Sequence, residues 1–153
     1  MSNKDLQRVT ESVSYKIGQA TSRRSLPTRR NHITQKVRIA GQRTLYLSVH
    51  DDEHPAKIFL RLKGSDCSSE LIGLYDVIAR LMSLTLQYSV RLEKVGDLLA
   101  YAKFAPCGSL SGHDRLKSCT SLPDLIGRHL LVEYCGREEL AHVLLSTNAE
   151  EVQ

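Results

Sequence analysis

The sequence predicts an α+β domain in which a small three-stranded antiparallel meander is followed by three packed helices. Two observations lead to this fold class. Apolar and polar residues alternate in three short segments between residues 33 and 62, and from residue 70 onward apolar residues recur at intervals of three and four. The change of period marks the point at which strands end and helices begin.

Three segments have the two-residue period of half-buried strands, namely residues 33–40, 45–49 and 57–62. A Gly-Gln pair separates the first two segments, and the polar run HDDEHP separates the second from the third. Both are typical of turns, and such short connections predict neighbouring antiparallel strands. The residues expected to face the core are Ile33, Val37, Ile39, Leu45, Leu47, Val49, Ile58, Leu60 and Leu62.

Three helices are expected over residues 70–88, 92–102 and 122–134. In the first of them apolar residues also occur outside a single stripe, which predicts a central helix covered on most sides. Serine and aspartate in the preceding GSDCSSE run suit its N-cap. For the third helix, Ser121 or Thr120 suits the N-cap, Pro123 is tolerated in the first turn, and Gly136 suits the C-terminal end.

Composition indicates one compact globular domain, because 41% of the residues are hydrophobic and 25% are charged. No run approaches the ~18 consecutive apolar residues of a membrane span. The N-terminal residues also lack the apolar stretch of a signal peptide. We therefore expect a cytoplasmic protein whose four cysteines are free thiols.

Positive charge is concentrated at the N-terminus. Residues 1–30 contain seven Lys or Arg and two acidic residues, whereas the other 123 residues contain 14 basic and 15 acidic ones. We expect a basic, flexible arm over residues 1–31, the α+β domain over residues 32–143 and a tail over residues 144–153. The run RRSLPTRR in the arm has two interpretations: a solvated leader, or an arm that contacts phosphate through guanidinium groups.

Residues 104–119 form the least regular segment and are expected to be a loop. Cys107, His113 and Cys119 are spaced by six residues, which permits a zinc site in this loop without requiring one. No Cys-x2-Cys pair occurs, so we expect ordinary thiols and no bound metal. His113 and Asp114, adjacent in a polar loop, are expected to be solvated.

Catalytic signatures are missing from the sequence. The six histidines include no His-Glu-x-x-His pair, and no nucleophile motif or glycine-rich phosphate loop occurs. From the residues alone, an enzyme is not expected.

Five short sequence motifs occur along the chain in the same order as in a known family. They are KIFL at residues 57–60, SLTLQYSVRLE at 83–93, FAPCG at 104–108, TSLPDLIGR at 120–128 and YCGREELAHV at 134–143. Over residues 23–143 the chain resembles the C-terminal accessory region, of the TSCPD-domain type, of adenosylcobalamin-dependent ribonucleotide reductases. The chain departs from the family's pattern where Ser89 replaces a glycine, Arg91 a proline and Ala105 an acidic residue, and where Pro123 enters the third helix.

The resemblance implies a stand-alone accessory module linked to deoxyribonucleotide supply. It would not be catalytic by itself, because the catalytic barrel and radical cysteines of that family have no counterpart here. No cofactor is expected on this chain, and adenosylcobalamin would act only through a large reductase subunit. That subunit or a second copy of the chain is the expected partner, with no membrane and no nucleic acid involved.

Two alternatives remain open at this point. Small phage proteins that sequester nucleotide-derived signals resemble the same domain type, which implies an oligomeric nucleotide-binding protein. Such a protein would need arginines on the phosphates and an aromatic ring on the base, and the candidates are Arg24, Arg29, Arg30, Arg115 and Phe104. The other alternative is an interaction module without a small ligand.

Overall fold

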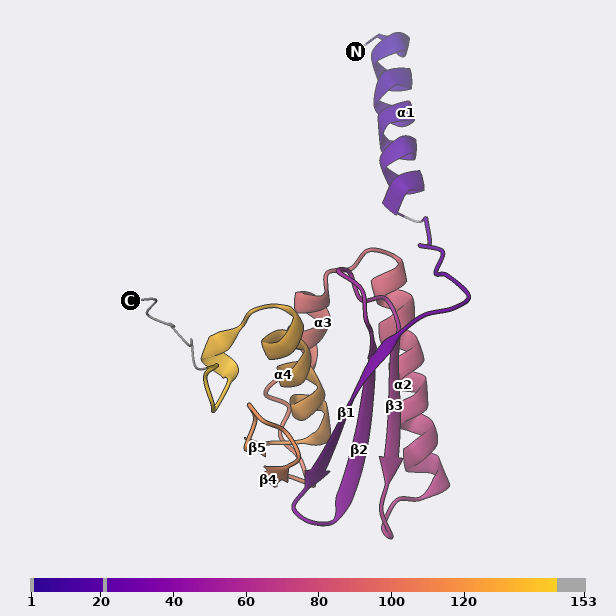
Figure 1. Ribbon diagram of the computed structural model, residues 1–153. Coiled ribbons are helices and arrows are strands. Elements are labelled where there is room, and N and C mark those ends of the chain that lie inside the picture. The colour runs from indigo at the N-terminus through magenta and orange to yellow at the C-terminus, as the bar shows by residue number, and fades with distance from the viewer. Residues whose placement is uncertain (1, 21, 146–153) are drawn as a thin grey trace, which may run out of the picture.

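The computed structural model describes residues 2–20 and 22–145. Its body is a five-stranded antiparallel sheet in the order β3-β2-β1-β4-β5, together with packed helices (Figure 1). The strands are β1 (His32–Ile39), β2 (Arg43–His50), β3 (Ile58–Lys63), β4 (Gly108–Ser111) and β5 (Ser118–Cys119). The helices are α1 (Asn3–Ala20), α2 (Ser69–Gln87), α3 (Leu92–Leu99), α4 (Leu122–Tyr134) and the 3-10 turn η1 (Glu138–Leu140). The α+β class and the initial meander are thus confirmed.

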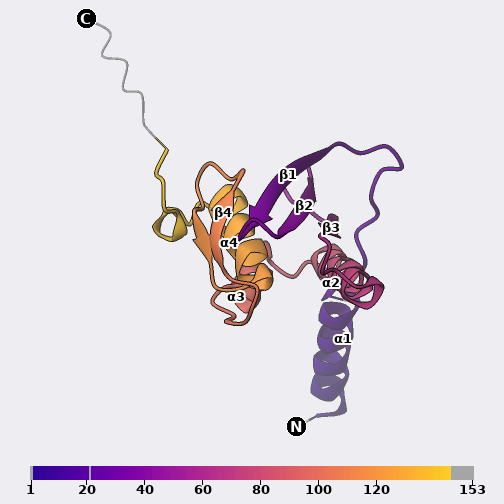
Figure 2. The same cartoon turned by 90° about the horizontal axis from the view of Figure 1, so that it is seen from below.

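The meander buries one face of each strand. Eight of the nine residues expected to face the core are buried, and Figure 2 shows α2 and α4 on the same side of strands β1 to β3. The exception is Ile33, which is 54% exposed. Strand β4 pairs with β1 only at Arg38 and Ile39, so the first half of β1 is a sheet edge without a neighbour on that side.

Serine side chains cap the N-termini of two helices, and another serine joins one of these helices to the sheet. Ser68 accepts a hydrogen bond from the Leu71 N–H at the start of α2 (3.1 Å), and Ser121 accepts one from the Asp124 N–H at the start of α4 (3.0 Å). Within α2 the buried Ser83 hydroxyl accepts from the Ile58 N–H of β3 (2.9 Å). The predicted N-cap of the helix at residues 122–134, which is α4, is therefore confirmed at Ser121.

Four details differ from the sequence-based expectations. Helix α2 is not covered on most sides, because part of its apolar surface faces solvent. Helix α3 ends at Leu99 because Ala100 is extended and Tyr101 has a left-handed backbone with φ of 67°. The loop at residues 104–119 contains the short strands β4 and β5, whose Gly and Ser residues carry little strand signal. Helix α1 lies in the arm for which no regular structure was expected.

The predictions for the two ends of the chain are only partly covered by the structure. Residue 21 and the tail residues 146–153 lie outside the described residues. No helix of the described residues is long and apolar enough to cross a membrane.

Two glycines let α3 and α4 approach closely. A Cβ atom added at Gly127 would lie 2.6 Å from the Ala100 nitrogen and 2.7 Å from the Gly96 carbonyl oxygen. A Cβ at Gly96 would lie 2.7 Å from a side-chain carbon of Leu131. The backbones of the two helices are therefore in contact, and this contact connects the α3–α4 pair to the segment that follows α3.

We expect Gly127→Ala to lower the free energy of unfolding by about 2 kcal/mol, because the methyl group would meet backbone atoms that cannot rotate away. Urea denaturation measures the change. Gly73→Ala in α2 is the matched control, since nothing lies within 4 Å of the added Cβ. That control should raise stability by roughly 0.5–1 kcal/mol through helix propensity. Equal effects of the two substitutions would contradict the proposed crowding.

Candidate functional site

The N-terminal segment that follows α1 is attached to the last turn of α2. The Arg24 N–H donates to the Gln87 carbonyl oxygen (2.8 Å), and the Arg23 Nε donates to the Gln87 side-chain oxygen (2.7 Å). The Gln87 amide nitrogen in turn donates to the Ala56 carbonyl (3.0 Å). Gln87 is only 4% exposed, so it fixes the basic segment against both α2 and the loop before β3.

This attachment forms a depression of about 430 Å³, which we call the basic pocket. Its lining consists of Arg23, Arg24, Ser25, Leu26, Arg30, Lys57 and Gln87. Four of these seven residues are cationic and none is acidic. Such an unbalanced lining raises the local concentration of anions.

Buried polar atoms without partners lie beside the basic pocket. Among the described residues, Arg30 Nε, His32 Nε2 and His50 Nδ1 are buried and have no hydrogen-bond partner. The two imidazole rings lie 5.7 Å apart. Burial lowers the pKa of His32, and the electrostatic effects of the neighbouring His50, Arg30 and Lys57 lower it further. The basic pocket and its surroundings therefore have a positive potential, which favours an anion.

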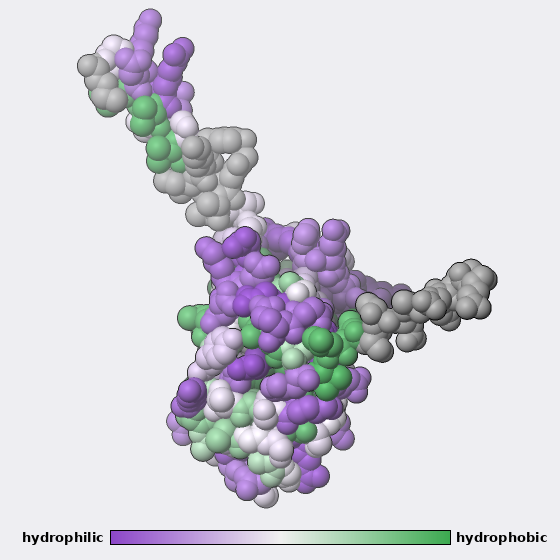
Figure 3. Space-filling view, turned by 90° about the vertical axis from the view of Figure 1, so that its left-hand side faces the viewer, coloured by the Kyte–Doolittle hydropathy of each residue, from purple (hydrophilic) through white to green (hydrophobic). Residues whose placement is uncertain are grey.

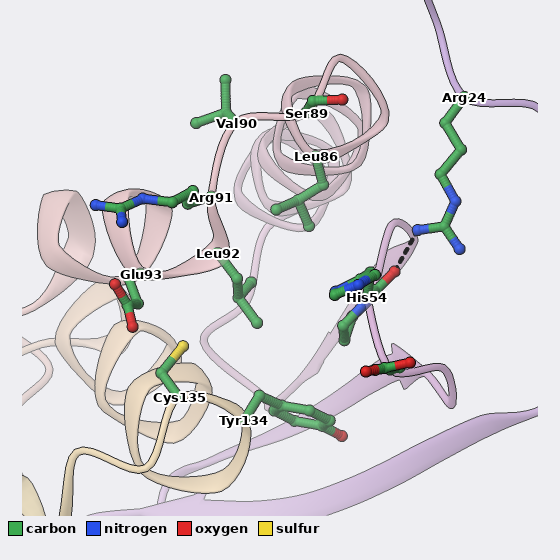
Figure 4. A pocket seen from close by; sticks show the side chains of 12 residues that line it. Arg24, His54, Leu86, Ser89, Val90, Arg91, Leu92, Glu93, Tyr134 and Cys135 are labelled. Atoms are coloured by element: carbon green, nitrogen blue, oxygen red, sulfur yellow. Dashed lines mark hydrogen bonds between the residues drawn. The ribbon is translucent and has the colours of Figure 1, made fainter.

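A second cavity of about 570 Å³ adjoins the basic pocket and shares Arg24 with it (Figure 4). Apolar groups from the α2–α3 turn and the end of α4 extend into it, among them Leu86, Leu92 and Tyr134. We call it the neighbouring cavity. Arg24 donates to the His54 carbonyl oxygen and lies 3.3 Å from an Asp52 carboxylate oxygen, which holds its guanidinium between the two spaces.

The five predicted site residues do not meet in one place. Arg24 and Arg30 line the basic pocket, and Arg29 is exposed in the same segment without lining it. Phe104 is 54% exposed in the segment between α3 and β4. Arg115 is 6% exposed and forms an ion pair with Glu138.

Two cations of the pocket were missed by sequence reasoning. Arg23 belongs to the basic run already singled out, so the run itself was the available signal. Lys57 lies at the entry to β3 and gives no local signal, because only the fold brings it to the basic segment. The cations of the basic pocket therefore include Arg23 and Lys57, and they do not include the predicted Arg29 and Arg115.

A second polar cluster is buried under α4. His113 Nε2 lies 3.0 Å from His129 Nδ1, and His113 Nδ1 accepts from the backbone N–H groups of Arg115 and Leu116, both at 3.1 Å. Because Nδ1 of His113 is an acceptor, its proton is on Nε2 and is donated to His129. The expectation of a solvated His113 was wrong, since this ring is 3% exposed and organises the turn that follows it.

The cysteines of the 104–119 segment lie in unlike surroundings. Cys107 is exposed and Cys119 is buried, and burial raises the pKa of the Cys119 thiol to about 11. Both ring nitrogens of His113 already face protein groups. Within residues 2–20 and 22–145, no group of three His, Cys, Asp or Glu side chains is placed to hold a metal ion.

Comparisons with known proteins agree on one family. Residues 13–134 match the TSCPD domain family. The chain is 35% identical over 123 residues to a vitamin B12-dependent ribonucleotide reductase of Agrobacterium fabrum (strain C58), covering 79% of this chain and 9% of the relative. It is 31% identical over 138 residues to a protein of the same name from Bradyrhizobium diazoefficiens (strain USDA 110), covering 90% of this chain and 11% of the relative. The chain thus spans about a tenth of these curated relatives. No solved structure matches it significantly.

Proposed function

The chain belongs to the TSCPD domain family, related to a small part of B12-dependent ribonucleotide reductases, and from this premise we propose that it is a non-catalytic accessory module that binds a phosphorylated nucleotide. The phosphates would occupy the basic pocket, and the similarity to the reductases supports a ligand that belongs to deoxyribonucleotide supply. The observation that carries the proposal is the lining of the basic pocket, which holds four cationic residues and no acidic one.

The two adjoining spaces suit the two halves of a nucleotide. Phosphate oxygens accept hydrogen bonds from guanidinium and ammonium groups, which the basic pocket offers through Arg23, Arg24, Arg30 and Lys57. A base is flat and largely apolar on its faces, and the neighbouring cavity offers Leu92 and Tyr134. Cavities of this size hold drug-sized ligands.

Adenosylcobalamin does not fit this site. The two cavities measure about 570 and 430 Å³, which suits a ligand of nucleotide size, and a corrinoid that carries an adenosyl group is several times larger. We therefore assign no step to that cofactor here. In the proposed function it acts through a large reductase subunit that this module contacts.

A second candidate function is sequestration of a nucleotide-derived signal. It is favoured by the position of Arg24, which lines both cavities. One guanidinium could then contact the phosphates of a signal molecule whose two ends occupy the two cavities. Ligand identity separates the two functions. A module for deoxyribonucleotide supply should prefer ribonucleoside or deoxyribonucleoside di- and triphosphates, whereas a sequestering protein should prefer a cyclic or dinucleotide-like signal.

We expect Lys57→Ala and Arg30→Ala each to weaken nucleotide binding about tenfold, because each removes one charge-assisted contact to phosphate. Isothermal calorimetry with dNTPs, ribonucleoside diphosphates and cyclic ADP-ribose isomers measures the affinities. Arg61→Ala is the matched control, since Arg61 is an exposed cation on β3, the strand that follows Lys57, and does not line either cavity.

The salt dependence provides a second readout of the same contact. Each lost phosphate contact should make the affinity less sensitive to salt, whereas Arg61→Ala should leave the dependence unchanged. Absence of binding by any member of the panel at millimolar concentration would reject nucleotide binding. Equal losses in the pocket variants and in Arg61→Ala would reject the site.

A further inference from the structure

Helix α2 carries an apolar stripe that no other part of the described chain covers. The α2 stripe consists of Leu74, Val77, Leu81, Leu84 and Tyr88, which are between 39% and 58% exposed. Their spacing of three and four residues is the spacing of a coiled-coil seam. The core contacts of α2 lie on its other side, through residues such as Ala79 and Leu86, so α2 has two apolar faces.

Helix α1 carries a second stripe with the same period. The α1 stripe consists of Leu6, Val9 and Val13, which are 49–52% exposed. Figures 1 and 3 show α1 projecting away from the body, with apolar surface along its uncovered side. A single helix of 18 residues is marginally stable in water, and it contains β-branched residues that lower helix propensity. Its stripe therefore requires a partner.

We propose that two copies of this chain form a dimer by reciprocal exchange, in which α1 of each copy packs on the α2 stripe of the other. Both stripes repeat at intervals of three and four, so their side chains can interdigitate along two helices that cross at a shallow angle. Asp76 and Arg80, ion-paired at 3.2 Å, lie next to the α2 stripe and would remain at the polar rim.

The attachment of the N-terminal segment favours the other copy over the same chain. Arg23 and Arg24 are hydrogen-bonded to Gln87, the last residue of α2. From that point α1 extends beyond the C-terminal end of α2 (Figure 1), so its stripe lies past the end of its own α2 stripe. A second copy placed alongside can present its α2 at that position.

The area of the two stripes also agrees with a dimer. Eight half-exposed apolar side chains present on the order of 600 Å² per copy, which is at the upper end of the about 300–600 Å² that the largest apolar patch on a monomer spans. With the polar rim included, this approaches the ~800 Å² per partner of a standard protein interface. The α2 stripe alone would provide roughly two thirds of the apolar part. Both stripes are therefore needed.

Solution mass tests the proposal directly. Light scattering on the full chain should give twice the mass of one chain, and Leu81→Glu or Val9→Glu should each return it to the mass of one chain. Leu98→Glu is the matched control, because Leu98 is an 83% exposed leucine on α3 outside both stripes, and this variant should keep the double mass. Circular dichroism of each variant confirms that the body remains folded.

A mixture of the two stripe variants distinguishes exchange from other pairings. In a mixed dimer of Val9→Glu and Leu81→Glu chains, one α1–α2 contact joins two intact stripes, so mixing should restore a substantial fraction of the double mass. A monomeric wild-type chain would overturn the proposal, since α1 would then have no second copy to pack on. A dimer that survives Val9→Glu, or a mixture that stays monomeric, would also overturn it and favour direct pairing of the α2 stripes.

Discussion

Asp124→Ala is expected to lower the free energy of unfolding by about 4 kcal/mol, because it removes the only carboxylate of a buried hydrogen-bond cluster and leaves three donors without it. Asp124 is 0% exposed. Its oxygens accept from the Tyr101 N–H (2.6 Å), the Thr120 N–H (3.0 Å) and the Arg128 Nε (2.9 Å). Burial alone would raise the pKa of this carboxyl, but the three donors outweigh burial and hold the pKa below its ordinary value.

Chemical denaturation of the variant measures the loss. Asp124→Asn separates charge from shape, since the amide oxygen can still accept one backbone hydrogen bond, and it should cost less than Asp124→Ala. Asp114→Ala is the control, because Asp114 is exposed and its removal should change stability by less than about 0.5 kcal/mol. A loss below about 1 kcal/mol for Asp124→Ala would show that the cluster reorganises or admits water.

The same cluster gives a physical meaning to the TSLPD part of the phrase at residues 120–128. Thr120 donates its hydroxyl to the Ala102 carbonyl (2.8 Å), Ser121 caps α4, and Asp124 holds the left-handed Tyr101. These residues fasten the segment after α3 to the start of α4. The phrase is thus explained by folding, and no catalytic role is needed for it.

Structural features that depend on local sequence could be predicted, whereas features that depend on contacts between distant residues could not. The meander and α4 could be predicted because alternation and capping are local properties, as at Ser121. The exposed stripe of α2 could not be predicted, because this helix was expected to be covered on most sides and only the packing decides which face meets the sheet. The left-handed Tyr101, which follows the end of α3, depends on a distant carboxylate and leaves no local pattern.

The same reasoning applies to the candidate site. Arg24 and Arg30 were predicted from a dense basic run, where composition alone is informative. Arg115 was predicted as a phosphate contact, yet the fold gives it Glu138 as a partner and buries it. Lys57 joined the pocket only through the hydrogen bonds of Gln87, which bring the basic segment to the loop before β3.

Acid is expected to destabilise the protein below pH 6.5 through the buried histidine pair. Burial, assisted by His113, lowers the pKa of His129 to about 3, and burial also lowers the pKa of His113 against the weaker opposing effect of Asp114. Both rings are neutral in the folded chain, whereas in the unfolded chain they titrate near their ordinary value of about 6.5. As the pH falls below 6.5, the unfolded state binds protons that the folded state does not, so stability falls.

The change of the unfolding free energy with pH follows from thermodynamic linkage between folding and proton binding. One histidine that stays neutral in the folded state costs ~1.4 kcal/mol per pH unit, so His129 alone should remove about 2–3 kcal/mol between pH 6.5 and 4.5. Urea midpoints at several pH values measure this slope. His129→Leu should lower the stability at pH 7.5, because the His113 Nε2–H loses its acceptor. It should also reduce the pH dependence of the unfolding free energy by the contribution of one titrating group.

Nuclear magnetic resonance tests the cause independently of stability. The ring protons of His129 should keep the shifts of a neutral imidazole from pH 8 down to the pH at which the chain unfolds. A titration of this ring near pH 6.5 in the folded protein would contradict the assignment. The turn at residues 113–116 should lose its order together with the global fold, because the protonation that would release His113 Nδ1 from its two backbone donors becomes favourable only when the rings reach water.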